Sequence, residues 1–79
     1  MDDSLKDKIL LTIADNIRIE RLKRKLTQDK LAEMCGITQK YLNLIEKAKV
    51  NPSILIVINI CKNLEIDLNT VYDLSSLTL

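Results

Sequence analysis

The 79-residue sequence contains no Phe, no Trp and no His, and it has one Gly, one Pro and two Tyr. Because large aromatic rings are almost absent, we expect an aliphatic core built mainly from Leu and Ile. So few Gly and Pro favour helices joined by short loops over a sheet fold. The sequence has no histidine, no Gly-rich phosphate loop, no paired carboxylates with a supporting base and no nucleophile with a partner. These absences argue against an enzyme, and we expect no catalytic residue and no cofactor.

The two cysteines, Cys35 and Cys61, lack the spacing of metal ligands, so we expect no metal site. Both fall at small apolar positions of the helical pattern, where a buried thiol acts as a small hydrophobic group. There is no run of about 18 apolar residues, so no membrane span is expected. The acidic start does not resemble a signal peptide. We therefore expect a cytoplasmic protein, and the length suits a single domain over residues 1–79.

Positive charge is concentrated in the middle of the chain, although the net charge is only +1. Residues 16–50 contain nine Lys or Arg against four Asp or Glu, a net charge of +5. Residues 1–15 and residues 51–79 each carry a net charge of −2. A basic segment of this kind is the electrostatic footprint of a nucleic-acid binder. An ordinary solvated face gives a similar count, so charge alone does not decide between the two.

The stretch Thr27–Glu46 has the pattern of two short helices joined by a sharp turn. Thr27 and Thr38 are suited to cap the two helices through their hydroxyl groups. Gly36 stands where the first helix needs a left-handed residue to end. Small Ala32 allows the helices to cross closely. The second helix then begins with exposed polar side chains that suit base edges in a major groove; these are Gln39, Lys40 and Asn43.

This pattern resembles the helix-turn-helix of the lambda-repressor-like (Cro/Xre) DNA-binding family. The residues that carry the resemblance are Gln28, Ala32, Gly36, Ile37, Leu42 and Ile45. The resemblance covers roughly residues 13–72 and implies an all-α fold, a compact five-helix lambda-repressor-like bundle with the helix-turn-helix at helices 2 and 3. Residues 1–12 then form an N-terminal helical extension, and residues 73–79 form a C-terminal tail. An ordinary helical hairpin in a small bundle is the alternative.

The resemblance also implies roles for individual residues. Gln39, Lys40 and Asn43 are expected to read bases. The expected phosphate-binding residues are Gln28, Thr38, Tyr41, Lys47, Lys49 and Asn51. Family members often join the positions of Arg21 and Glu46 by an internal ion pair, which would hold the recognition helix in place. Two independent surface charges are the alternative for that pair.

The first helix is expected from about Leu5 to Arg24, with Ser4 at its start as the N-terminal cap. Three positions depart from the family pattern. The family usually has an apolar residue where Glu20 stands, and this leaves the phase of the helix open. It usually has glycine where Lys25 and Glu65 stand, so the backbone at those two turns is also open.

After Ser53, which is suited to cap a helix, the segment ILIVINI is apolar almost all round. The family register favours a helix from Ile54 to about Leu64, and a buried strand is the alternative. A short fifth helix is expected after Asp67. The C-terminal third then has more apolar surface than the core can use, which usually marks an interface. The expected dimer interface consists of Leu55, Ile56, Ile66, Leu68, Tyr72 and Leu74.

These observations predict a sequence-specific DNA-binding transcriptional regulator that binds a (pseudo)palindromic operator as a homodimer through the major groove. The partners expected are double-stranded DNA and a second copy of the chain, with no membrane. In size the sequence resembles the controller proteins of restriction–modification systems and small phage repressors. The alternative is an antitoxin-type or antirepressor-type module whose main partner is another protein, such as a toxin. The same apolar surface suits either partner.

Overall fold

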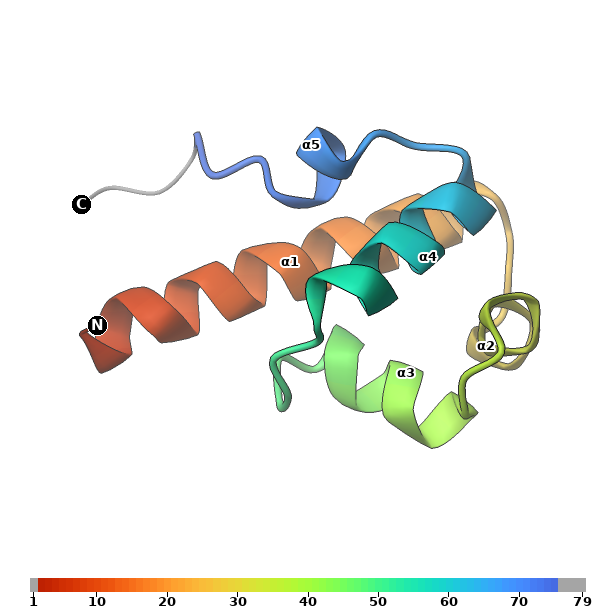
Figure 1. Cartoon of the computed structure of the whole chain (residues 1–79), viewed down its shortest axis with the longest axis horizontal. Helices are drawn as coiled ribbons and strands as arrows, with labels where there is room; N and C mark the ends of the chain where they lie inside the picture. Colours follow the sequence, from red (N-terminus) through yellow and green to blue (C-terminus); the bar gives the residue numbers. More distant parts are fainter. Residues whose placement is uncertain (1, 76–79) are drawn as a thin grey trace.

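The structure is a computed structural model that describes residues 2–75. Residues 76–79, the last part of the expected C-terminal tail, lie outside the described residues. Five helices follow one another, and the described chain has no strand (Figure 1). They are α1 (Asp3–Lys23), α2 (Gln28–Cys35), α3 (Gln39–Glu46), α4 (Ile54–Leu64) and α5 (Leu68–Val71). The all-α expectation is confirmed, and the segment after Ser53 is a helix and not a strand.

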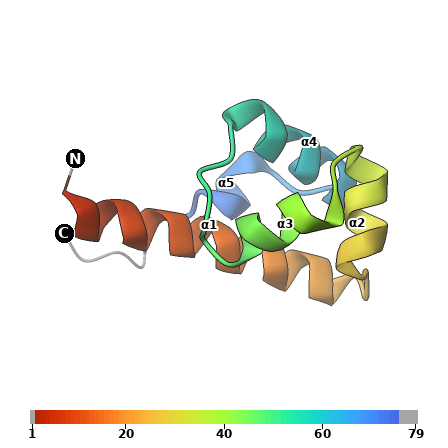
Figure 2. The same ribbon diagram turned by 90° about the horizontal axis from the view of Figure 1, so that it is seen from below.

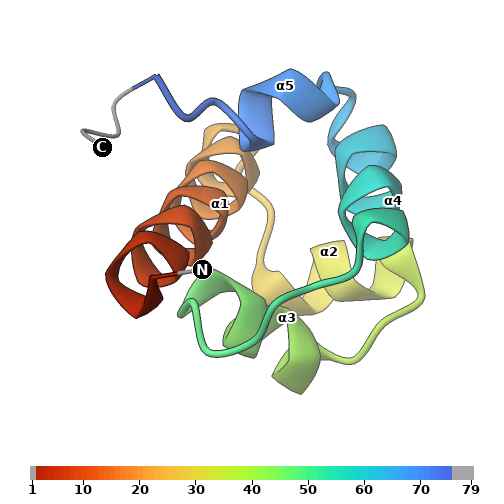
Figure 3. The ribbon, with the colours of Figure 1, turned by 60° about the vertical axis from the view of Figure 1, so that its left-hand side comes forward.

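The helices surround one aliphatic core. Figure 3 shows α1 and α4 on opposite sides, with α5 at one end and α2 and α3 at the other. Cys35 and Cys61 are both buried in this core as free thiols, and burial raises the pKa of each thiol. The buried apolar cluster consists of Ile13, Ile17, Leu31, Ala32, Cys35, Leu42, Ile45, Val57, Ile60, Cys61, Leu64 and Val71.

Three of the expected helix caps are confirmed and one is wrong. The side chains of Thr27, Thr38 and Ser53 each accept a hydrogen bond from the backbone N–H three residues on. At α1, however, Asp2 is the cap, because its carboxylate accepts from the N–H of Ser4 at 2.9 Å. The positive end of the helix dipole also favours a charged carboxylate at this position more than an uncharged serine hydroxyl.

The phase of α1 is settled by burial. Glu20 is buried, whereas Ile19 and Leu22 on either side are 43% and 55% exposed. Glu20 lies three residues after buried Ile17, on the same face of the helix. Its carboxylate accepts from Lys23 Nζ at 3.1 Å and from Arg24 Nη1 at 2.9 Å. The hydrogen bonds from Arg24 and Lys23 lower the pKa of Glu20 and so favour its charged form at a position where the resemblance implied an apolar residue.

Two turns adopt left-handed backbone conformations at positions where the resemblance implied glycine and this chain has other residues. Lys25 and Glu65 adopt left-handed backbone conformations with φ of 55° and 58°. Ala48, in the loop after α3, does the same with φ of 58°. The β-carbon of a non-glycine residue makes this conformation unfavourable by roughly 1 kcal/mol. The helices on either side therefore hold the chain in turns that its local sequence does not favour.

Candidate nucleic-acid interface

The turn between α2 and α3 sets the direction in which α3 leaves the core. Gly36 has φ of 69°, the left-handed conformation expected for it, and ends α2. Asn59 of α4 donates from Nδ2 to the carbonyl of Cys35 at 2.7 Å, which fixes the end of α2. Leu42 and Ile45 are fully or almost fully buried on the inner face of α3. The opposite face of α3 lies on the surface of the molecule, in the view of Figure 2.

A buried ion pair joins α1 to the last residue of α3. Arg21 Nε lies 2.9 Å from Glu46 Oε2, and Arg21 Nη2 lies 2.9 Å from Glu46 Oε1. The two side chains are only 11% and 2% exposed. Arg21 Nη1 also donates to the carbonyl of Leu26 at 2.7 Å, in the turn before α2. Such a two-bond pairing of guanidinium and carboxylate has a defined geometry, so it fixes α3 against α1.

A chain of amide groups continues from this ion pair to the surface. Glu46 Oε1 accepts from Gln28 Nε2 at 3.2 Å. Gln28 Oε1 in turn accepts from Gln39 Nε2 at 2.8 Å and from Asn43 Nδ2 at 3.2 Å. Gln28 is the first residue of α2, whereas Gln39 and Asn43 lie one turn apart on α3. The network therefore links the core of the protein to two of the residues expected to read bases.

The network leaves some hydrogen-bonding groups free on the two outer amides, those of Gln39 and Asn43. An amide side chain has two N–H donors and one carbonyl acceptor. Gln39 and Asn43 each use one N–H for Gln28, so each keeps its carbonyl oxygen and one N–H. Gln28 keeps one N–H beyond the one that it gives to Glu46. Each outer amide thus has one acceptor and one donor left for a ligand.

Three lysines beside these amides carry unpaired charge. Lys40, Lys47 and Lys49 are exposed, and within residues 2–75 none of them forms an ion pair. By contrast, Lys23 and Arg24 are paired with Glu20. These three lysines therefore place unpaired positive charge on α3 and on the loop that leads from it to α4 (Figure 2).

The other residues expected to contact DNA differ in how exposed their side chains are. Asn51 is exposed in the loop before α4. Thr38 is exposed, but its hydroxyl accepts from the N–H of Tyr41 at 3.0 Å as the α3 cap. Tyr41 is half-buried and packs against the core cluster. The structure thus leaves Thr38 and Asn51 exposed, although the Asn51 side chain also lines a cavity between α1 and Tyr72, and it gives Tyr41 a packing role.

The residues expected at a dimer interface separate into two groups. Leu55 is 74% exposed and Leu74 is 38% exposed. The others are half-buried and pack against the core; they are Ile56, Ile66, Leu68 and Tyr72. Two further exposed side chains of α4 lie outside that set, Ile54 at 50% and Ile58 at 45%. Ile54 and Ile58 are four residues apart, and Leu55 lies three residues before Ile58, so the helical spacing groups them on one side of α4. We call Ile54, Leu55 and Ile58 the α4 apolar surface.

The described part of the chain gives no sign of a metal site, a membrane span or a buried polar group without a partner. Among residues 2–75, no three or more of His, Cys, Asp and Glu are placed to hold a metal ion. No helix there is long and apolar enough to span a bilayer. Every buried side-chain nitrogen or oxygen of these residues has a hydrogen-bond partner, so no buried polar group is left to mark a ligand site.

Solved structures with the same arrangement of helices include a controller protein and two regulators by title. The restriction-modification controller protein C.AhdI from Aeromonas hydrophila superposes with a TM-score of 0.77 at 22% identity, over 80% of this chain and 96% of that one. The clp gene regulator ClgR from C. glutamicum gives 0.81 at 20% identity, over 90% and 95%. An HTH_3 family transcriptional regulator from Vibrio cholerae gives 0.80 at 24% identity, over 86% of this chain and 38% of that one. At these identities the likeness shows the fold alone.

The family of the chain is shown by its sequence. No curated protein matches the chain. The helix-turn-helix family model HTH_3 matches residues 17–71, which includes α2, α3, α4 and the Arg21–Glu46 pair. The match covers most of the chain and leaves out the first part of α1. The chain therefore belongs to the HTH_3 helix-turn-helix family of DNA-binding transcriptional regulators, which are not enzymes.

Proposed function

We propose that this protein is a sequence-specific regulator that binds a (pseudo)palindromic operator as a homodimer, with α3 in the major groove and Lys40 beside two base-reading amides. The observation that carries the proposal is the amide network. It orients Gln39 and Asn43 and leaves each with one acceptor and one donor. Adenine presents one donor and one acceptor in the major groove, so each amide matches one adenine. Lys40 can reach the acceptors of guanine.

Phosphate contacts would surround this base-reading centre. Lys47 and Lys49 are exposed cations next to α3, and Asn51 follows them in the same loop. The free N–H of Gln28 and the polar groups of Thr38 and Tyr41 complete the proposed set. Such contacts fix the position of the protein on the duplex without reading sequence.

The base-reading role is tested with operators selected from a random DNA pool. We expect Asn43→Ala to lose about 1–3 kcal/mol of binding free energy on the selected site and much less on random DNA. Gln39→Ala should behave in the same way. Asn69→Ala is the matched control, because Asn69 is an exposed asparagine on α5. An equal loss on both kinds of DNA would rule out base reading by these amides.

The phosphate role is tested by the salt dependence of binding. Removing one phosphate contact should reduce the slope of log K against log salt by about 0.9. We expect this change for Lys47→Gln and for Lys49→Gln, on specific and random DNA alike. Lys8→Gln on the far part of α1 removes the same charge and should leave the slope nearly unchanged. A slope that stays at the wild-type value removes the lysine concerned from the phosphate set.

Dimerisation is proposed through the α4 apolar surface together with Leu74 and the half-buried residues around α5. A two-fold dimer places two recognition helices about 34 Å apart, one turn of DNA. Because Leu55 is 74% exposed, Leu55→Asp should produce monomers without unfolding the domain. Leu22→Asp is the control, since Leu22 is 55% exposed on α1. Sedimentation at micromolar concentration is the measurement, and a wild-type protein that stays monomeric on operator DNA contradicts the model.

A role as a controller of a restriction–modification system is a narrower form of this proposal. Its support is the match to C.AhdI over 96% of that chain. The α4 apolar surface also suits a different protein partner, as in an antitoxin. That alternative predicts a monomer that binds DNA weakly until the partner is added, so the same sedimentation experiment separates the two. The cytoplasmic location expected from the sequence stays a prediction.

A further inference from the structure

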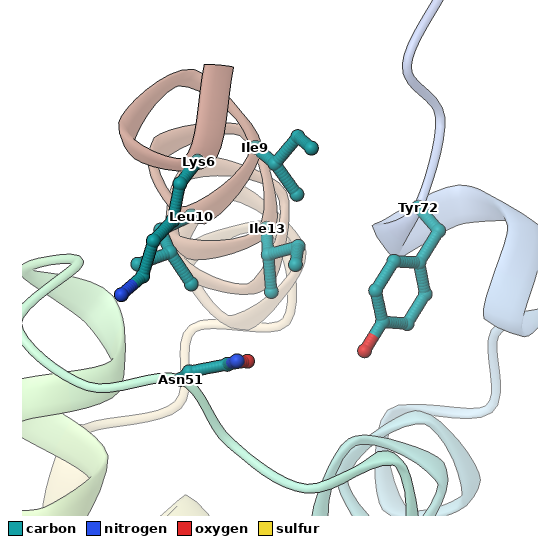
Figure 4. A pocket seen from close by; sticks show the side chains of 6 residues that line it. All are labelled: Lys6, Ile9, Leu10, Ile13, Asn51 and Tyr72. Atoms are coloured by element: carbon teal, nitrogen blue, oxygen red, sulfur yellow. The ribbon is translucent and has the colours of Figure 1, made fainter. Parts of the chain in front are cut away.

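A cavity of about 140 Å³ lies outside the helix-turn-helix, between segments that are far apart in sequence. One wall is the early part of α1, another is the loop before α4, and the third is the residue after α5 (Figure 4). The family match begins after the α1 residues that line it. Its lining residues are Lys6, Ile9, Leu10, Ile13, Asn51 and Tyr72.

The walls of the cavity are apolar and the polar groups lie at its edge. Ile9, Leu10 and Ile13 come from one face of α1, and the ring of Tyr72 stands opposite them (Figure 4). The volume is close to that of a cavity of about 150 Å³ that is known to hold one benzene molecule. The cavity therefore has room for a single six-membered ring or a branched chain of similar size.

The polar groups at the edge favour a negative charge. Lys6 supplies an ammonium group, and within residues 2–75 it has no acidic partner within 4.0 Å. The amide of Asn51 can donate an N–H. Burial raises the pKa of the Tyr72 phenol, so its hydroxyl is protonated at neutral pH and can donate as well. No aspartate or glutamate lines the cavity, and Asp3 and Asp7 on the same helix are exposed.

We propose that this cavity binds a small carboxylate that carries one aromatic ring or one branched aliphatic chain. The apolar part occupies the space between α1 and Tyr72, and the carboxylate meets Lys6 at the edge. A few well-placed polar groups around an apolar pocket are the usual composition of a small-molecule site. The site would give a binding role to the N-terminal extension, which lies outside the family match.

The proposal is tested on the full chain by NMR titration with benzoate. We expect saturable shifts of the amide and methyl signals of the lining residues, with a dissociation constant on the order of a millimolar for so small a ligand. Lys6→Met should weaken benzoate binding about two- to five-fold, the range of an exposed ion pair. Lys8→Met is the matched control, because Lys8 is an exposed lysine of the same helix that does not line the cavity.

Benzyl alcohol, which has the ring without the charge, separates the two parts of the proposal. It should bind more weakly than benzoate and should be unaffected by Lys6→Met. Equal affinity for both ligands would overturn the carboxylate preference. Absence of saturable shifts would overturn the site. The site would also be overturned if the NMR signals of the lining residues respond to protein concentration and not to benzoate, because a second copy of the chain then fills the cavity. None of these readouts involves DNA, so they are separate from the proposed base and phosphate contacts, and the dependence on protein concentration is the one readout shared with the proposed dimer.

Discussion

Breaking the Arg21–Glu46 pair is the most informative test of how α3 is held. Arg21→Met leaves the carboxylate of Glu46, whose side chain is 2% exposed, without its cationic partner. Loss of one partner of a buried pair costs about 3–5 kcal/mol. We expect the lower end, about 3 kcal/mol, because Gln28 Nε2 still donates to Glu46 and Arg21 itself is 11% exposed. This is a large part of the roughly 5–15 kcal/mol that stabilises a domain.

Urea unfolding followed by circular dichroism measures the effect. With a slope of about 1 kcal/mol per molar for a chain of this size, the midpoint should fall by about 3 M. The double variant Arg21→Met with Glu46→Leu should recover most of the loss, since an apolar replacement of a buried pair is often neutral or stabilising. Arg18→Met is the control, because the Arg18–Asp15 pair is 41% exposed on both sides and should contribute at most about 1 kcal/mol.

Two outcomes would contradict this role of the Arg21–Glu46 pair. If Arg21→Met and Arg18→Met have the same small effect, the buried pair is not what fixes α3 against α1. A double variant as unstable as the single one would also contradict it, because the cost would then arise from lost packing and not from an unpaired charge.

Three further changes test the backbone and the Glu20 cluster. Lys25→Gly should raise the free energy of unfolding by about 0.5–1 kcal/mol in a thermal melt, since glycine accepts the left-handed conformation found there. Gly36→Ala should lower it by about 1 kcal/mol for the same reason, and a β-carbon there meets no atom within 4 Å, so no clash adds to the cost. Because the pKa of Glu20 is lowered in the folded state, its stabilisation is present above its unfolded pKa of about 4.3 and is lost as the pH falls through the folded value. The stability difference between wild type and Glu20→Gln should therefore shrink below about pH 4 in acid titrations of unfolding.

The elements of the fold could be predicted because their signals are local. A hydroxyl residue before each of α2, α3 and α4, and Gly36 after α2, mark helix ends through bonds to the nearest backbone groups. At α1 the expected cap, Ser4, was wrong because Asp2, two residues earlier, has a similar propensity to cap a helix. Glu20 is different, because its burial depends on Lys23 and Arg24 reaching back to it, and a pattern of apolar residues does not contain that information.

The positions of the candidate residues on the helices could be predicted, but the hydrogen bonds between them could not. Gln28, Gln39 and Asn43 were each expected to face DNA from their positions on the helices. That Gln28 bonds to both of the others depends on how α2 and α3 cross, a tertiary geometry that no spacing in the sequence encodes. On α4 the helical spacing did predict the side that faces the core, because Val57, Ile60, Cys61 and Leu64 form the buried stripe.

The network connects stability and recognition through Glu46, and the double variant of the ion pair can separate them. With Met at position 21 and Leu at position 46, the core recovers its packing, but Gln28 loses the acceptor of its Nε2 group. Gln28 Oε1 still accepts from Gln39 and Asn43. The three amides therefore stay hydrogen-bonded to one another but lose their hydrogen bond to the core. Side chains that are no longer fixed must be ordered on binding, at about 0.5–1.5 kcal/mol each. We therefore expect a stable double variant whose affinity for the selected operator falls while its affinity for random DNA stays near wild type. If a stable double variant reads the operator as well as the wild type, the ion pair serves folding alone and has no part in recognition.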